Sequence, residues 1–238
     1  MTPGAEEAEG AVPPGRALGA IKAVLWDLDG TLTDSVRFVV DTANLVIDRH
    51  GGRHLDFDEV GQVTGLSLEA IFRLAWPDLS PDDAVTYRDE YRAHYDEHII
   101  PATRLFRGAK TTLRLFHRAG LRQATVTGKR AADCERILRG LGIARDIDAY
   151  LGGDSVPRAK PAPDLALLAI ERLGIRARDA VVVGDTRGDM EMGRTAGART
   201  LQVLWGFERE PLPDADMTAR TWSELRARIL PPDGPLRP

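Results

Sequence analysis

The sequence predicts an α/β protein in which helices cover both faces of a parallel β-sheet. Apolar segments at the start of residues 21–34, at 121–128 and at 180–185 read as strands, and each is followed by a helical pattern. Strands that alternate with helices along the chain pack as a parallel sheet. Residues 34–105 show helical patterns without a strand signal, so we expect a helical insert that interrupts this alternation.

Composition limits the classes of protein that the chain can represent. The 238 residues are 43% hydrophobic, enough for one large domain or for a core domain with a smaller insert. The formal charge of −4 comes without a basic stripe, which argues against a nucleic-acid partner. Because the chain lacks a run of about 18 apolar residues, we expect no membrane span. Its single cysteine, Cys134, excludes an intramolecular disulfide and favours a reducing, cytoplasmic location.

The first half of the chain is expected to be a disordered tail, a strand and a series of helices. Residues 1–19 are rich in Gly, Pro, Ala and Glu and lack the apolar core of a signal peptide. Helical spacing follows over 35–50, where Gly51-Gly52 ends the helix. A second helix from about Asp58 is broken around 64–66, and further helices follow from Ser67, an expected N-cap, and over 81–99.

The second half returns to alternating strands and helices and closes with a Pro-rich tail at 231–238. Glycines after several of the helical segments supply the expected stops. The chain shows no internal repeat of the length found in solenoids. In order, the pattern predicts a helix at 109–119, a strand at 121–128, a helix at 130–141, a short strand at 149–152, a helix at 163–173, a strand at 180–185, a helix at 189–196, a strand at 200–204 and a helix at 223–229.

The first strand ends in two acids, Asp27 and Asp29. Residues two apart in a strand share a face, so both carboxylates point the same way. Gly30 allows a sharp turn, and Thr31 adds a hydroxyl beside the acids. Two carboxylates at the end of a buried strand repel each other, and a divalent cation is the usual compensation. The alternative is an acidic turn of the kind common in α/β proteins.

Other strand ends carry groups that complement these acids. Ligands of open parallel sheets bind outside the carboxyl ends of the strands, so these ends should meet. Asp185 ends a later strand and Asp189 begins the next helix. Four gathered carboxylates with hard oxygen atoms predict a Mg²⁺ site, together with waters and a substrate phosphate. The alternative role of Asp189 is a helix N-cap, worth about 1 kcal/mol, and both roles are compatible.

Two further positions suit a phosphate. Thr127-Gly128 offers a hydroxyl and backbone N–H groups between a strand and a helix, although an ordinary helix cap is an alternative. Lys160 precedes Pro161-Ala162-Pro163, where a helix is expected to open. A cation at that end of a helix opposes the macrodipole, so it needs an anionic partner, either the aspartates or a bound phosphate. The chain has only four lysines: Lys22, Lys110, Lys129 and Lys160.

Taken together, four segments resemble the motifs of the haloacid dehalogenase (HAD) superfamily. Their order and spacing are similar to the phosphoglycolate phosphatase-like branch with a helical cap. The resemblance implies a Rossmann-like, doubly wound core of residues 20–33 and 106–230 with an all-helical cap domain at 34–105. The segments are DLDGTLTD at 27–34, VTG at 126–128, KPAPD at 160–164 and GDTRGDMEMGRTAGA at 184–198.

The resemblance also implies a role for each motif residue. Asp27 would be the nucleophile that takes the phosphoryl group, and Asp29 would be the general acid and base. A Mg²⁺ ion would be held by Asp27 and Asp185, by the backbone carbonyl of Asp29, and by Asp189 as an outer ligand. The groups that would bind the phosphoryl oxygens are Thr127, Gly128 and Lys160.

The implied activity is Mg²⁺-dependent hydrolysis of a small-molecule phosphate monoester by a monomer or homodimer. Gly128 departs from the family's usual Asn, so contacts to substrate or phosphate can differ there. The combination of TGK at 127–129 with VPRAKPAPD at 156–164 resembles family members of aminohydroxybenzoate antibiotic biosynthesis, which points towards specialised metabolism.

The residues present also bear on three alternative functions: a dehalogenase, a phosphosugar mutase and a non-catalytic binding protein. Dehalogenases of the superfamily lack the second aspartate, so Asp29 favours phosphoryl chemistry. A phosphosugar mutase would more closely match Arg after Ser67, where this chain has Leu68. A non-catalytic binding protein on the same fold is the third alternative, and the presence of every motif acid and of Lys160 argues against it.

Overall fold

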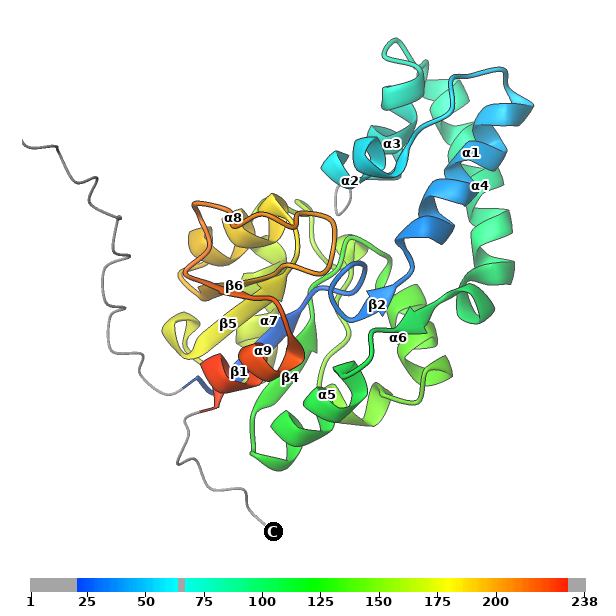
Figure 1. The fold of residues 1–238 in the computed structure, drawn as a ribbon. Helices are drawn as coiled ribbons and strands as arrows, with labels where there is room; N and C mark the ends of the chain where they lie inside the picture. The colour runs from blue at the N-terminus through cyan, green and yellow to red at the C-terminus, as the bar shows by residue number, and fades with distance from the viewer. Residues whose placement is uncertain (1–20, 64–66, 231–238) are drawn as a thin grey trace, which may run out of the picture.

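A computed structural model describes residues 21–63 and 67–230 of the chain. The two expected tails and the expected helix break at 64–66 lie outside the described residues. The centre of the molecule is a five-stranded sheet with the order β4-β1-β5-β6-β7, and all of its neighbouring strands are parallel (Figure 1). Its strands are β1 (Ala23–Trp26), β4 (Arg122–Thr125), β5 (Ala180–Gly184), β6 (Arg199–Val203) and β7 (Met217–Ala219).

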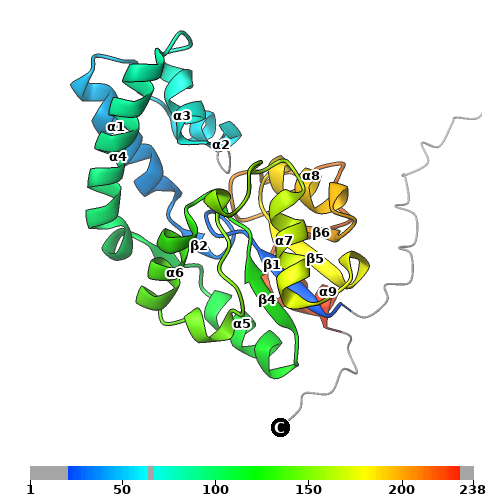
Figure 2. The same cartoon turned by 180° about the vertical axis from the view of Figure 1, so that it is seen from behind.

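Helices cover both faces of the sheet, as the sequence predicts. All four residues of β1 are buried, and they alternate between two apolar cores because successive strand residues face opposite ways. Val24 and Trp26 join the core formed with α5 (Ala109–Arg118), α6 (Ala131–Gly140) and α9 (Trp222–Ile229). Ala23 and Leu25 join the core on the other face, formed with α7 (Asp164–Leu173) and α8 (Arg187–Thr195), which Figure 2 shows from behind.

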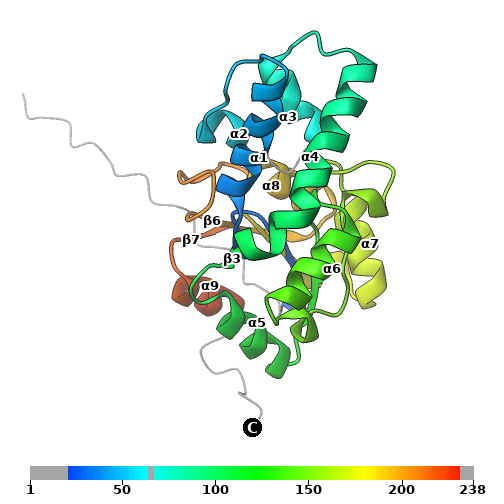
Figure 3. The ribbon, with the colours of Figure 1, turned by 90° about the vertical axis from the view of Figure 1, so that its right-hand side faces the viewer.

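The helical insert begins and ends in a small β-ribbon. β2 (Thr33–Asp34) pairs antiparallel with β3 (Arg104–Leu105), so the chain leaves and re-enters the core at adjacent points. The ribbon was not predicted, because two-residue strands carry no periodicity. The helices between them stand apart from the central sheet, and the last of them runs back towards β3 (Figure 3). They are α1 (Val36–Arg49), α2 (Phe57–Val63), α3 (Leu68–Ala75) and α4 (Pro81–Ala102).

Two differences from the sequence prediction concern short strands. The strand expected at 149–152 is wrong, since Ala149 forms only an isolated parallel bridge to Ala124. The edge strand β7 was not predicted, because it has only three residues, two of them partly buried, and lacks an apolar run. Ser67 is the N-cap of α3, as expected, and its hydroxyl accepts a hydrogen bond from the N–H of Ala70. Among the described residues, none of the helices combines the length and the hydropathy that a bilayer crossing requires.

Candidate active site

Aspartates from neighbouring strands meet at the carboxyl edge of the sheet, close to the start of the insert. Asp27 follows β1 and Asp185 follows β5, and these two strands pair in parallel with Trp26 beside Val183. The N–H of Asp27 continues the ladder by donating to the carbonyl of Val183 at 2.9 Å. The backbone register therefore brings the two carboxylates together, as the expected convergence of strand ends requires.

Asp27, Asp185 and Asp189 form a compact cluster of carboxylates. One oxygen atom from each lies within 4.8 Å of those of the other two, and all three residues are buried. Buried carboxylate oxygens at this spacing suit a small hard cation, and Mg²⁺ commonly takes one or two carboxylates together with waters and phosphate oxygens. The residues present thus fit the expected Mg²⁺ site. The carboxylate of Asp29 lies outside this cluster.

Two hydrogen-bond donors orient the carboxylate of Asp185, and two glycines leave the space that it occupies. The hydroxyl of Thr31 donates to its Oδ1 at 2.9 Å, and the N–H of Phe207 donates to its Oδ2 at 2.7 Å. A Cβ atom at Gly30, where φ is +80°, would lie 2.1 Å from Oδ2, and one at Gly206 would lie 2.2 Å from it. Burial, reinforced by the nearby charges of Asp27 and Asp189, raises the pKa of Asp185 well above its ordinary value.

Asp189 lies in the first turn of α8, and Thr186 is the N-cap of that helix. The alternative role of Asp189 as the N-cap is therefore wrong, because the helix begins two residues earlier than predicted, at Arg187. Thr186 donates to Oδ2 of Asp189 through its hydroxyl at 2.6 Å and through its N–H at 3.1 Å. This capping box orients the carboxylate so that its other oxygen, Oδ1, faces Lys160.

Lys160 is buried between two of the aspartates. Its Nζ donates to Oδ1 of Asp27 at 2.6 Å and to Oδ1 of Asp189 at 2.5 Å, so the aspartates are the anionic partner that its position requires. Burial by itself would lower the pKa of Lys160, but Asp189 and Asp27 raise it above its ordinary value. Burial also raises the pKa of Asp27 to about 7, with Lys160 opposing the shift and Asp189 and Asp29 adding to it.

Asp29 faces a different set of partners. Its Oδ2 forms an ion pair with Nζ of Lys129 at 2.8 Å, and its Oδ1 accepts a hydrogen bond from the hydroxyl of Ser35. Lys129 is a residue of the site that the sequence motifs did not predict. Its position directly after Thr127-Gly128, in a chain with only four lysines, was the available signal.

Thr127 and Gly128 lie at the same edge of the sheet and line the cavity with Asp27 and Lys160. Thr127 is buried, and its hydroxyl accepts a hydrogen bond from the N–H of Lys129 at 3.4 Å. The loop therefore lies beside the carboxylates, and its role in binding an anion stays a prediction.

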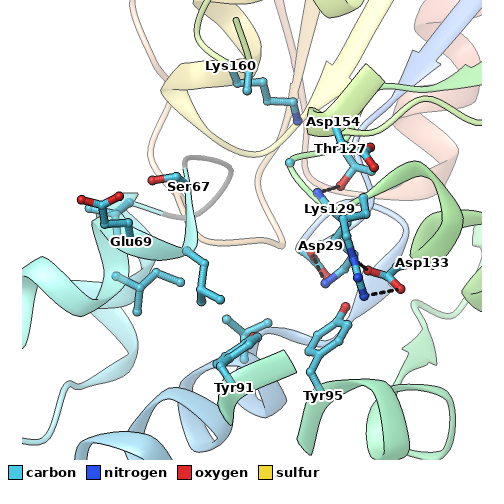
Figure 4. Close-up of a pocket in the computed structure, with 18 of the residues that line it drawn as sticks. Asp29, Ser67, Glu69, Tyr91, Tyr95, Thr127, Lys129, Asp133, Asp154 and Lys160 are labelled. Atoms are coloured by element: carbon cyan, nitrogen blue, oxygen red, sulfur yellow. Dashed lines mark hydrogen bonds and ion pairs between the residues drawn. The ribbon is translucent and has the colours of Figure 1, made fainter. Parts of the chain in front are cut away.

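The site opens into a cavity of about 460 Å³ between the sheet edge and the insert (Figure 4). This volume falls in the range of small-molecule sites, roughly 300–1,000 Å³. The insert contributes apolar side chains, two tyrosines of α4 and three charged side chains, while the core contributes the aspartates and lysines described above. The charged residues of the insert are Glu69, Arg88 and Arg92. Lining residues from the insert include Val39, Leu68, Ile71, Tyr91, Arg92 and Tyr95.

Comparison with known proteins identifies the family to which this chain is similar. The family model described as haloacid dehalogenase-like hydrolase matches residues 24–203. A phosphoglycolate phosphatase of Aquifex aeolicus is 29% identical over 86% of this chain and 95% of its own length. An N-acetylmuramic acid 6-phosphate phosphatase of Pseudomonas aeruginosa is 32% identical over 79% of this chain and 83% of its own length.

Solved structures agree with the sequence matches. A haloacid dehalogenase-like family hydrolase from Streptococcus pneumoniae has a TM-score of 0.77 at 26% identity, covering 88% of this chain and 98% of that chain. A HAD family hydrolase from Deinococcus radiodurans, solved with bound phosphate and sodium, has a TM-score of 0.68 at 26% identity over 88% and 95% of the two chains.

The chain belongs to the haloacid dehalogenase-like hydrolase family, and the resemblance carried by the four motifs is confirmed. Within that family it is a phosphatase, that is, a phosphoric monoester hydrolase.

Proposed function

We propose that this phosphatase hydrolyses a small-molecule phosphate monoester with Mg²⁺, through a phosphoryl group carried transiently on Asp27. The observation that supports this most strongly is the buried cluster of Asp27, Asp185 and Asp189, with Lys160 bridging two of them at the floor of a cavity. Such a cluster is costly to bury unless cations offset it. Mg²⁺, when bound, would neutralise charge on the carboxylates and on the phosphoryl oxygens.

In the proposed reaction Asp27 supplies the nucleophilic oxygen. A bond forms between a carboxylate oxygen of Asp27 and phosphorus, while the bond from phosphorus to the leaving oxygen breaks. Lys160, the hydroxyl of Thr127 and the backbone N–H of Gly128 would hold the phosphoryl oxygens. Their fixed positions at the strand ends need little rearrangement as charge develops, and this lowers the barrier.

Asp29 would transfer the protons, first when the alcohol leaves and then when water attacks the phosphorylated Asp27. In its acid form it donates a proton to the departing alcohol oxygen, and as a carboxylate it then accepts one from the water that attacks phosphorus. That attack breaks the bond to Asp27, so the nucleophile is regenerated and inorganic phosphate leaves. The carboxylate of Asp29 lies outside the Asp27, Asp185 and Asp189 cluster, which is consistent with a role in proton transfer.

We propose that the helices between β2 and β3 act as a cap that chooses the leaving group. Relatives at about 30% identity are named for two different substrates, phosphoglycolate and N-acetylmuramic acid 6-phosphate, so the family match alone leaves the substrate open. The insert lines the cavity with apolar and aromatic side chains and with Glu69, Arg88 and Arg92, and these side chains are placed to contact the leaving group. A role in specialised metabolism, the cytoplasmic location and a monomer or homodimer remain predictions.

The first test is hydrolysis of p-nitrophenyl phosphate by the purified chain with Mg²⁺. Asp27→Asn should lower kcat/KM by about 1,000-fold or more, because the amide is a poor nucleophile. Circular dichroism of the variant should match the wild type. Undiminished turnover in a folded Asp27→Asn variant would rule out the nucleophile assignment.

A panel of phosphate esters then addresses the leaving group and the alternatives. Phosphoglycolate, hexose phosphates and nucleotides should differ in kcat/KM by well over tenfold if the cavity selects the substrate. Isomerised sugar phosphate in the NMR spectrum would support the mutase alternative. Binding of phosphate esters without release of phosphate from any of them would support the binding-protein alternative.

A further inference from the structure

Asp29 is held by contacts at the boundary between the core and the insert. One carboxylate oxygen accepts from the hydroxyl of Ser35, which is the N-cap of α1 and the point where the chain enters the insert. The other oxygen is paired with Lys129 at 2.8 Å, and the two side chains are only 12% and 10% exposed. The orientation of this carboxylate therefore depends on the two groups that meet it there.

Lys129 in turn contacts the longest helix of the insert. Its Nζ lies over the ring of Tyr95, 4.7 Å from the ring centroid, in a cation–π arrangement. Tyr95 comes from α4 and stacks on Tyr91 at a centroid distance of 5.6 Å. Figure 4 shows Lys129 and Tyr95 pointing towards one another from opposite walls of the cavity.

Burial raises the pKa of Tyr95, and Lys129 opposes this rise through its charge and through a side-chain hydrogen bond. The ring and the hydroxyl of Tyr95 therefore both interact with Lys129. The ammonium group lies between the ring of Tyr95 and Oδ2 of Asp29 and contacts both. A lysine suits this place, because a compact ammonium on a flexible stem can face a ring and a carboxylate together.

We propose that Lys129 is a positioning residue that couples the placement of α4 to the orientation of Asp29. The inference rests on the proposed function, in which Asp29 protonates the leaving group. When α4 lies as it does here, the ring of Tyr95 confines the ammonium group and the ammonium group fixes Asp29. Movement of α4 away from the core removes the ring, so Asp29 is well oriented for proton transfer only when the insert covers the site.

The test compares two esters of similar size that differ in their need for a proton. p-Nitrophenolate is a weak base and leaves without protonation, whereas the alkoxide from benzyl phosphate is strongly basic and requires it. Lys129→Met should lower kcat for benzyl phosphate by about 100-fold but kcat for p-nitrophenyl phosphate by only about tenfold. KM should change little for either ester. The measured signature is the change in the ratio of the two kcat values.

Companion variants separate this role from general damage. Tyr95→Leu removes both the ring and the hydroxyl and should shift the ratio in the direction of Lys129→Met, while Tyr95→Phe keeps the ring and should shift it less. Lys22→Met is the matched control, because Lys22 is 59% exposed and pairs with Asp179 at 3.7 Å. Lys22 directly precedes β1 and so lies at the opposite end of this strand from Asp27. If thermal melts show that Lys129→Met is unfolded, the ratio of the two kcat values is measured for Tyr95→Leu instead.

Asp27→Asn and Asp29→Asn distinguish failure of the inference from failure of the proposed function. If Asp27→Asn abolishes hydrolysis of both esters and Asp29→Asn shifts the ratio, the proposed function stands. An equal loss for both esters in Lys129→Met, or a Tyr95→Leu ratio equal to that of the wild type, then overturns the coupling. Should Asp29→Asn leave the ratio unchanged, the proton-transfer role itself is wrong, and the inference about Lys129 is overturned together with it.

Discussion

Asp27 is buried beside both negative and positive charge. Burial and the neighbouring carboxylates raise its pKa to about 7, although Lys160 binds it at 2.6 Å. In the protein alone, the carboxylate of Asp27 that is needed for attack on phosphorus is therefore only partly ionised near neutral pH. A divalent cation beside it stabilises that ionised form, which links metal binding to the protonation of the site.

This linkage predicts a pH-dependent stabilisation by Mg²⁺. A folded-state pKa of about 7, raised from 3.8, gives a contribution to stability that is fully present below pH 3.8 and is lost as pH rises through 7. The raised pKa of Asp185 acts in the same direction. In the proposed site Mg²⁺ would bind the ionised carboxylates, so the increase in Tm between EDTA and excess Mg²⁺ should be larger at pH 8 than at pH 5.5.

Scanning calorimetry measures this difference in Tm directly. Asp27→Asn should reduce it at pH 8, because the amide contributes no titration at that position. An increase in Tm that is the same at both pH values would contradict the link between Asp27 and the metal.

At the scale of single elements, α8 serves both the fold and the site. Thr186 caps the helix and also donates two hydrogen bonds to Asp189, so helix formation and carboxylate orientation depend on the same residue. The capping box satisfies backbone N–H groups that would otherwise lack partners at the first turn. Folding of α8 therefore sets the direction of one carboxylate in the cluster.

Thr186→Ala should lower the free energy of unfolding by about 1 kcal/mol and also weaken Mg²⁺ binding. The second effect is expected because Asp189 loses the hydroxyl of Thr186, one of the two donors to its Oδ2, and keeps only the backbone N–H. Thr221→Ala is the matched control, since Thr221 caps α9 by accepting from the N–H of Glu224 at 3.2 Å, on a helix outside the cavity lining. Urea unfolding and the Mg²⁺ dependence of activity measure the two effects, and equal Mg²⁺ dependence in both variants would contradict the prediction.

Across the whole molecule, the ribbon of β2 and β3 connects the helical insert to the core. Asp34 lies opposite Arg104 in this ribbon, so the two ends of the insert are neighbours in space. The helices α1 to α4 pack on one another and present apolar side chains to the cavity. We propose that residues 34–105 form a separable domain on a core that holds the carboxylate cluster.

Excision of the insert tests this division. Replacing residues 35–103 by an Asn-Gly turn should close the ribbon as a tight hairpin and leave a folded core. We expect cooperative thermal unfolding with stabilisation by Mg²⁺, because the cluster comes from the core strands and α8. Discrimination between small and large phosphate esters should fall, as measured by the spread of kcat/KM across the panel. An unfolded product would contradict the domain division.

The sequence alone determined the strands and helices that have a strong local pattern, and with them the acids of the site. The end of an apolar run marks the edge of a sheet, so the pattern of residues was enough to place Asp27 and Asp185 at one edge. Gly30 could likewise be predicted as a turn, since its position needs a positive φ. The family followed from four motifs whose spacing agrees along the chain.

Only the tertiary structure decided several contacts that do not follow from the ends of the predicted strands. The pairing of Lys129 with Asp29, the ring of Tyr95 over that lysine and the ribbon of β2 with β3 have no local signal. The edge strand β7 forms by pairing with β6, and the strand expected at 149–152 is lost because its pairing reduces to a single bridge. The periodicity of a sequence indicates on which face of its own helix or strand a residue lies, whereas these contacts depend on how separate elements pack.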